Sequence, residues 1–98
     1  MADGISDILR SRLMSLIRSR NAKNSSSTIC PSEVPRTLER DGEIEAGTWR
    51  EHMDATREIV FGLRDEGVVE VLQKGDVIHT GLEDVRGPIR VRLVETEK

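Results

Sequence analysis

Cysteine and aromatic residues are scarce in this chain of 98 residues, which holds one cysteine, one tryptophan, one phenylalanine and no tyrosine. A single cysteine cannot form an internal disulfide, the usual support of small secreted domains, so we expect an intracellular protein, cytoplasmic or nuclear. Two aromatic rings are too few for a surface that stacks successive bases of a single strand. No apolar run approaches the roughly 20 residues that cross a bilayer, so we expect a soluble protein with no membrane among its partners.

An excess of positive charge is also absent. Fifteen lysine and arginine residues against eighteen aspartate and glutamate residues give a net charge of −3. A non-specific nucleic-acid coat is strongly basic, so any nucleic-acid contact of this chain must come from a local patch. The length fits one domain over residues 1–98, with an ordered core over about 5–94, and leaves no room for a second core.

The first half of the chain predicts two helices. Over residues 5–20, apolar side chains recur at steps of three and four, which is typical of a helix with one buried face. Residues 21–27 are small and polar, and we expect a mobile loop there that leads into a short extended stretch. Two prolines then suit the first turn of a second helix, because backbone N–H groups there have no partner within the helix. This second helix follows an N-cap at Cys30 or Ser32 and ends by Arg40.

A capping box, Thr48 with Glu51 three residues later, predicts the start of the longest helix, over about 48–66. We expect one face of this helix to pack against apolar side chains of the first two helices. The expected core residues are Trp49, Met53, Val60 and Leu63 on this helix and Ile8, Leu9, Leu16 and Leu38 on the other two. Phe61 lies about 100° off this face. The first helix covers it, which we favour, or it is exposed as a partner or dimer surface.

The second half of the chain predicts strands. Runs rich in β-branched residues over 68–73 and 77–80 flank Lys74-Gly75 and predict a β-hairpin, because glycine supplies the positive φ of a tight turn. A last strand over 89–93 alternates apolar residues with Arg90 and Arg92, which places both guanidiniums on one face. Three helices followed by a small antiparallel hairpin or sheet are the order of a winged helix-turn-helix domain, so the predicted fold class is α+β.

Five motifs occur in the order that one family of small proteins shows. They are Thr28-Ile29-Cys30-Pro31-Ser32-Glu33-Val34, Trp49-Arg50 with Met53, Gly67 with Glu70, Gln73-Lys74-Gly75, and Arg86-Gly87-Pro88-Ile89-Arg90. Over roughly residues 5–94 the chain therefore resembles a family catalogued only as a domain of unknown function. The resemblance implies a winged-helix fold and brings no activity, substrate or catalytic residue. The connection over 39–47 is longer and more acidic than the pattern of that family.

The C-terminal part of the chain carries the candidate binding site. Arg86, Arg90 and Arg92 follow one another without an acidic residue between them, and Lys74 on the hairpin turn can join them. Guanidinium groups hold phosphate oxygens in bidentate fashion, so this basic patch predicts weak, salt-dependent binding of DNA or RNA. The alternative is structural, with one or two of these arginines paired to nearby acids. Those acids are Glu70, Glu83 and Asp84.

The third helix suits nucleic acid less well, although recognition helices of this architecture enter the major groove. Its three cations are outnumbered by five acids, and the preceding loop adds Asp41, Glu43 and Glu45. We therefore expect a self-paired, solvent-exposed face on this helix. The alternative function is a protein-protein interaction or dimerisation domain that uses the surface of the third helix around Phe61.

Catalytic chemistry finds little support in the residues. Cys30 precedes a helix start, where a thiolate is stabilised, but no spacing connects it with His52 or His79. One cysteine and two distant histidines do not match a zinc pattern, which needs about four ligands. We expect a binding module that is not an enzyme, without a metal, a cofactor or a catalytic residue.

Overall fold

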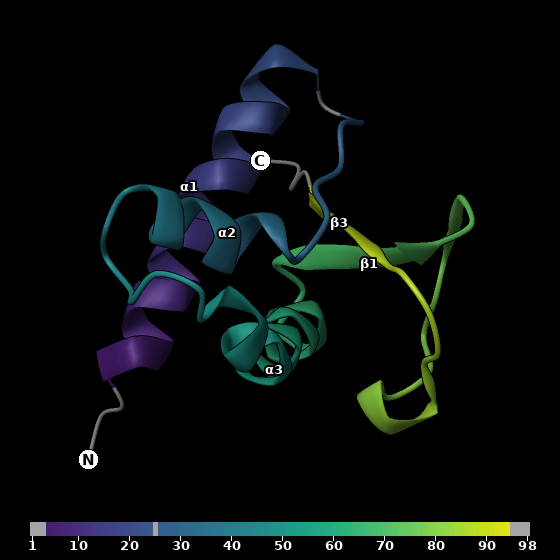
Figure 1. Cartoon of the computed structure of the whole chain (residues 1–98). Coiled ribbons are helices and arrows are strands. Elements are labelled where there is room, and N and C mark those ends of the chain that lie inside the picture. Colours follow the sequence, from purple (N-terminus) through teal and green to yellow (C-terminus); the bar gives the residue numbers. More distant parts are fainter. Residues whose placement is uncertain (1–3, 25, 95–98) are drawn as a thin grey trace.

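The computed structural model describes residues 4–24 and 26–94. Within these residues the chain forms three α-helices, two short 3-10 helices and a three-stranded antiparallel sheet (Figure 1). In chain order the elements are α1 (Gly4–Lys23), α2 (Glu33–Arg40), η1 (Trp49–His52), α3 (Met53–Asp65), β1 (Val69–Gln73), β2 (Asp76–Val77), η2 (Leu82–Asp84) and β3 (Arg90–Leu93). The predicted α+β class is confirmed.

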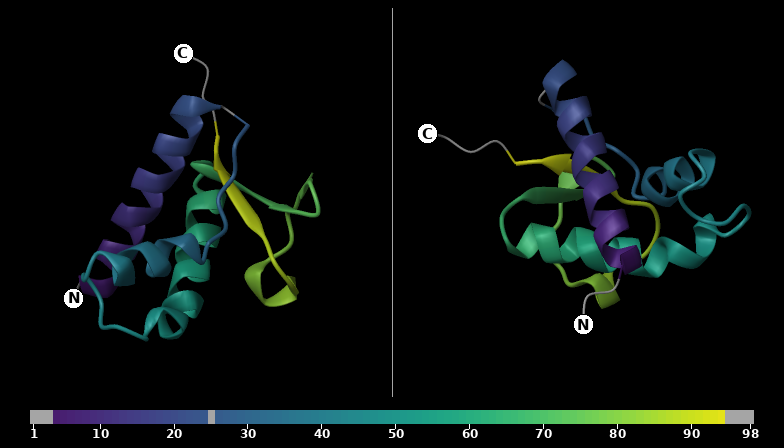
Figure 2. Two further views of the ribbon diagram at one scale, coloured as in Figure 1. Left: turned by 45° about the horizontal axis from the view of Figure 1, so that its top comes forward. Right: turned by 90° about the vertical axis from the view of Figure 1, so that its left-hand side faces the viewer.

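Helix α1 is longer than the sequence analysis predicted. It extends to Lys23, so residues 21–23 belong to its last turn and not to the predicted loop. The N–H of Asn24 still donates to the carbonyl of Arg20 at 3.1 Å, because nothing in this polar stretch interrupts the helical hydrogen bonds. The helix packs on α2, α3 and β3, and it crosses α3 in the right-hand view of Figure 2.

The buried stripe of α1 consists of Leu9, Leu13 and Ile17, which are at most 2% exposed. Steps of four residues keep these side chains on one face of the helix. That face turns the neighbouring Ile8 away, leaving it 37% exposed, and Leu16 is only partly buried. The prediction that Ile8 belongs to the core is therefore wrong, whereas Leu16 is partly buried and packs against the core.

Helix α2 ends at Arg40, as predicted, and Ser32 occupies its N-cap position. The Ser32 side chain makes no capping hydrogen bond. Instead, Glu33 reaches back, and its carboxylate accepts a hydrogen bond from the N–H of Cys30 at 3.0 Å. Just before the helix, Ile29 pairs with Val91 of β3 in an isolated antiparallel bridge, which confirms the short extended stretch.

The predicted capping box at Thr48 is wrong. The Thr48 hydroxyl donates to the carbonyl of Glu45 at 2.6 Å, and Glu51 is exposed. An N-cap residue is normally extended, which lets its side chain reach forward to the N–H groups of the first turn. Thr48 instead has φ −109° and ψ 2° and follows Gly47 at φ 82°. Its side chain therefore closes the preceding turn, and α3 proper begins five residues later, at Met53.

The prediction that Trp49 and Met53 lie in the core is also wrong, because both are only half-buried. Residues 49–52 form the 3-10 helix η1, which has about three residues per turn, so Trp49 does not stay in phase with the α-helical stripe behind it. The core face of α3 consists of Thr56, Val60, Phe61 and Leu63. Phe61 is 5% exposed, which confirms the favoured prediction that it is covered.

The sheet has the strand order β2-β1-β3, and both strand pairs are antiparallel. Lys74 and Gly75 form the two-residue turn between β1 and β2, with φ 53° and 87°. Positive φ at both positions matches the right-handed twist of the strands, so the predicted hairpin is confirmed. Strand β2 is shorter than predicted, because pairing with β1 ends at Val77. The helices cover the face of the sheet that carries Val71 and Val91.

Candidate functional site

Three of the four predicted site residues line one hollow of about 500 Å³ on the surface. Lys74 comes from the hairpin turn, Arg86 from the loop after η2, and Arg90 from the start of β3. Gln73, Gly87 and Pro88 complete the lining, and we call these six residues the basic groove. None of the six is acidic, and the exposed lining is mostly apolar. In Figure 1 the β1–β2 hairpin projects away from the three helices, whereas η2 contacts α3.

One hydrogen bond holds the two sides of the basic groove together. The side-chain amide of Gln73 donates to the carbonyl of Arg86, which fixes the hairpin end against the loop before β3. Gly87 follows with φ 86°, a left-handed conformation that glycine adopts without strain. The loop therefore turns sharply at this point, which brings Arg86 to the same hollow as Lys74.

Arg90 is held by the segment before α2. Its guanidinium donates to the hydroxyl of Thr28 at 2.9 Å and to the carbonyl of Thr28 at 3.2 Å. The bridge between Ile29 and Val91 sets this contact, because it places Thr28 beside the start of β3. Both acceptors are uncharged, so the hydrogen bonds orient the guanidinium without neutralising it.

Arg92 lies outside the basic groove. It faces Glu70 across the β1–β3 ladder, and its Nε donates to the Glu70 carboxylate at 2.7 Å. The structural alternative in the sequence analysis is therefore confirmed for Arg92. Arg90, two residues earlier, pairs instead with Leu72, which has no charge to offer. The register of the two strands thus gives Arg92 an acidic partner and Arg90 an apolar one, although both arginines lie on the same face of β3.

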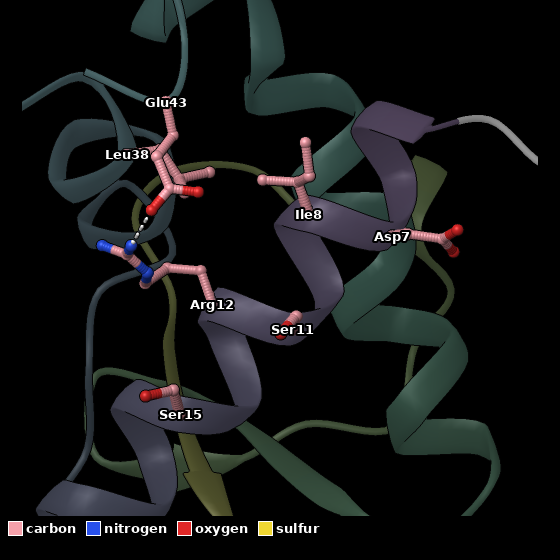
Figure 3. Close-up of a pocket in the computed structure, with 7 residues that line it drawn as sticks. All are labelled: Asp7, Ile8, Ser11, Arg12, Ser15, Leu38 and Glu43. Atoms are coloured by element: carbon pink, nitrogen blue, oxygen red, sulfur yellow. Dashed lines mark hydrogen bonds and ion pairs between the residues drawn. The ribbon is translucent and has the colours of Figure 1, made fainter. Parts of the chain in front are cut away.

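The acidic loop between α2 and η1 is neutralised in large part by arginines. Arg12 of α1 donates to Asp41 at 2.8 Å and to Glu43 at 2.9 Å, and Arg40 donates to Asp41 at 2.9 Å. Figure 3 shows Arg12 reaching from α1 to Glu43 beside a surface pocket. Hydrogen bonds from Arg40 and Arg12 lower the pKa of Asp41 from 3.8 to about 2. These ion pairs hold the loop against α1.

Trp49 is the residue whose surroundings the sequence analysis missed. The guanidinium carbons of Arg36 and Arg50 lie 5.2 Å and 4.6 Å from the centroid of its ring, so both cations lie over the indole. Helix α2 packs against η1, which brings Arg36 to a residue 13 positions away in sequence. The hydrophobic pattern contains no signal for this contact, since it counts Trp49 only as an apolar residue.

The other residues considered for a function, Cys30 and Phe61, contact only other parts of the protein. The Sγ of Cys30 lies 3.3 Å from the hydroxyl of Ser32. Arg64 places its guanidinium 4.7 Å from the centroid of the Phe61 ring and donates to the carbonyl of Thr80 at 2.6 Å. The Phe61 ring is therefore not part of an exposed apolar patch. Among the described residues, no group of three histidine, cysteine, aspartate or glutamate side chains is placed to hold a metal ion.

Three helices packed on one face of a small antiparallel sheet define the chain as an α+β protein with a basic groove at the edge of its hairpin. Residues 6–94 match the family described as Protein of unknown function (DUF3253), and the chain belongs to this family. No curated protein matches the sequence. Across residues 4–24 and 26–94, none of the helices has both the length and the apolar character needed to cross a membrane.

Proposed function

We propose that this protein is a non-enzymatic binding module that holds the phosphates of a nucleic acid in its basic groove. The observation that carries the proposal is the convergence of Lys74, Arg86 and Arg90 on one hollow without an acidic lining residue. Lysine and arginine supply charged donors to phosphate oxygens, and an uncompensated cluster of them attracts a polyanion. Among the described residues, none of these three side chains forms an ion pair with a carboxylate.

The element order supports interpreting the fold as a winged helix-turn-helix. Helix α2 and the η1–α3 segment correspond to the helix-turn-helix, and the β1–β2 hairpin with the loop to β3 corresponds to the wing. The bridge of Ile29 to Val91 adds the first extended segment between α1 and α2. In this interpretation the basic groove lies on the wing. The analogy with known winged helices adds nucleic acid as a partner class only by association, so the site chemistry has to carry the proposal.

Contacts to phosphate predict weak binding that depends steeply on salt and little on base sequence. With three phosphate contacts, a plot of the logarithm of the association constant against the logarithm of the salt concentration has a slope of about −2.7 for duplex DNA and about −2.1 for a single strand. Raising the salt from about 50 mM to about 200 mM should then weaken duplex binding roughly 40-fold.

The test is a titration of fluorescently labelled mixed-sequence DNA and RNA at several salt concentrations. The double variant Lys74→Glu/Arg86→Glu should abolish binding, because it reverses two of the three positive charges of the groove. The fold should be kept, because neither side chain has another described contact to lose. Arg18→Glu/Arg57→Glu is the matched control, with the same change in charge on α1 and α3, and should bind like the parent protein. Circular dichroism and thermal unfolding confirm that both variants are folded.

Stronger loss of binding in the control than in the groove variant would overturn this assignment and place the nucleic-acid surface on the helices. Absence of binding to both DNA and RNA at about 50 mM salt, where electrostatic binding is strong, would refute the nucleic-acid proposal. A protein-protein interaction domain would then be the leading function. A salt slope near zero with retained binding would also contradict a phosphate-based mechanism.

A further inference from the structure

A second group of unneutralised cations surrounds the indole of Trp49, apart from the basic groove. Arg36 from α2 and Arg50 from η1 both place their guanidiniums over this ring, at 5.2 Å and 4.6 Å from its centroid. We call these three residues the Arg-Trp cluster. The indole is half-buried and both arginines are exposed, so the cluster is open to a ligand from solvent.

The acids around the Arg-Trp cluster do not neutralise it. The Oε1 of Glu39 accepts a hydrogen bond from the backbone N–H of Trp49 at 3.1 Å. Asp41 and Glu43 of the preceding loop are bound by Arg12. Among the described residues, neither guanidinium of the cluster has a carboxylate within ion-pair distance. Two guanidiniums therefore lie over one ring, and in the described contacts the Glu39 carboxylate binds the Trp49 backbone and neither guanidinium.

The chemistry of the two guanidiniums defines the ligand that fits. A guanidinium stacked on a ring keeps its N–H donors in its own plane, where they can bind the oxygens of an anion in bidentate fashion. Two such groups beside one ring suit an anion with several oxygens and a double negative charge. A phosphate monoester has both properties, with three acceptor oxygens and a charge of about −1.5 to −2 at pH 7.

The charges further from the ring favour a compact anion over an extended one. Glu45, Glu51 and Asp54 are exposed near the cluster and have no described ion pair. A nucleic-acid strand would bring several phosphates close to these acids, whereas a single phosphate group meets only the two guanidiniums.

We propose that Arg36, Trp49 and Arg50 form a binding site for a single phosphate monoester group, carried by a phosphorylated peptide or by a small phosphate compound. This site is separate from the basic groove and does not rest on the nucleic-acid proposal. The backbone of Trp49, held by Glu39, and the contact of α2 with η1 keep the two arginines in place before the ligand arrives. Such pre-organisation lowers the entropy cost of binding.

Trp49 is the only tryptophan of the chain, so its fluorescence reports on this site alone. The full-length protein is titrated with inorganic phosphate, with a pentapeptide carrying a central phosphoserine, and with the same peptide unphosphorylated. Sodium chloride at matched ionic strength corrects for screening. We expect saturable fluorescence changes with phosphate and with the phosphopeptide, and none with the other two ligands. Tighter binding of the phosphopeptide points to a protein partner, and equal affinities point to a small phosphate compound.

Variants show whether the two arginines make the site. Arg36→Gln and Arg50→Gln should each weaken phosphopeptide binding, measured by calorimetry, by about tenfold or more, because each removes a charge-assisted contact. Arg36→Lys should also weaken it, since lysine keeps the charge but loses the planar donor group. Arg57→Gln is the matched control on α3 and should bind like the parent protein.

Three results would overturn the proposal. The first is a fluorescence response to phosphate no larger than the response to chloride. The second is equal binding by the parent protein and by both glutamine variants at Arg36 and Arg50. The third is a duplex or single-stranded oligonucleotide that perturbs Trp49 and binds there, in an Arg36-dependent way, more tightly than the phosphopeptide. That third result would assign the cluster to nucleic acid.

Discussion

Truncation of Leu9 tests how α1 is rotated about its axis in the core. Leu9 is fully buried, and Leu9→Ala removes three carbon atoms, worth about 2.4 kcal/mol of transfer free energy at roughly 0.8 kcal/mol each. A residual cavity of about 50 Å³ adds about 1 kcal/mol at roughly 24 cal/mol per Å³. We therefore expect the free energy of unfolding to fall by about 3.5 kcal/mol.

The assay is urea and thermal unfolding followed by far-UV circular dichroism. In a domain of this size, each kcal/mol shifts the Tm by roughly 4 to 8 °C, so Leu9→Ala should unfold about 14 to 28 °C below the parent protein. This loss is a large part of a total stability of about 5 to 15 kcal/mol. A fall in the slope of the urea transition would show that the variant is no longer two-state, and the hydrogen-exchange rates of α1 would then replace the Tm as the readout.

Ile8→Ala is the matched control, because Ile8 directly precedes Leu9 on the same helix and the substitution also removes three carbon atoms. Its side chain is 37% exposed, and alanine is the better helix former, so the change should cost less than about 1 kcal/mol. Equal losses at both positions would refute the reasoning. They would mean that α1 buries the broader face expected from its sequence, with both neighbours in the core.

Two further predictions concern the connection between α2 and α3. Hydrogen bonds from Arg40 and Arg12 hold the pKa of Asp41 near 2 instead of 3.8, so these contacts stabilise the fold above about pH 4 and lose this effect as the pH falls toward 2. Asp41→Asn should remove that part of the pH dependence in acid unfolding, and identical profiles would contradict it. Thr48→Val should lower the free energy of unfolding by about 1 kcal/mol through loss of the hydrogen bond to Glu45, whereas Glu51→Ala should change it by less than about 0.5 kcal/mol. A larger loss of unfolding free energy in Glu51→Ala would show that Glu51 caps the helix, as the sequence predicted.

Local sequence patterns predicted the elements whose structure depends on neighbouring residues. The Lys74-Gly75 turn has a glycine where positive φ is needed, and the alternation over 89–93 correctly placed Val91 in the core. Helix α2 ends at Arg40 because Asp41 and Gly42 continue as a turn, with Gly42 at φ 77°. These features are set within a few residues and are visible in any window of that length.

The features that sequence reasoning missed depend on contacts between distant residues. The ion pairs of Arg12 with Asp41 and Glu43 span 29 and 31 positions, and they fix the loop that leads into Thr48. No local pattern shows that these ion pairs hold the loop, so the spacing of Thr48 and Glu51 alone predicted a capping box. In the same way, periodicity could not decide between adjacent apolar residues on α1, because the choice depends on how the helix is turned toward α3.

The candidate site was predictable in composition but not in arrangement. Alternation correctly put Arg90 and Arg92 on one face, yet only the strand register shows that Glu70 stands opposite Arg92 and Leu72 opposite Arg90. The same holds for Arg86, whose place in the hollow depends on the hydrogen bond from Gln73 across the loop. The sequence gives the sign of each side chain's charge, but whether an acid neutralises an arginine depends on which residue the fold places beside it.

The pairing of some cations with acids also bears on the two anion sites proposed for this acidic chain. Arg12 and Arg92, whose side chains are 18% and 29% exposed, are paired with acids. The cations of the basic groove and of the Arg-Trp cluster are exposed and keep their charge. At physiological ionic strength charges are screened beyond about 8 Å, well below the molecular extents of 37 × 31 × 29 Å. An approaching phosphate therefore meets the charge of its nearest neighbours, and the net charge of −3 excludes a general nucleic-acid coat without excluding either local site.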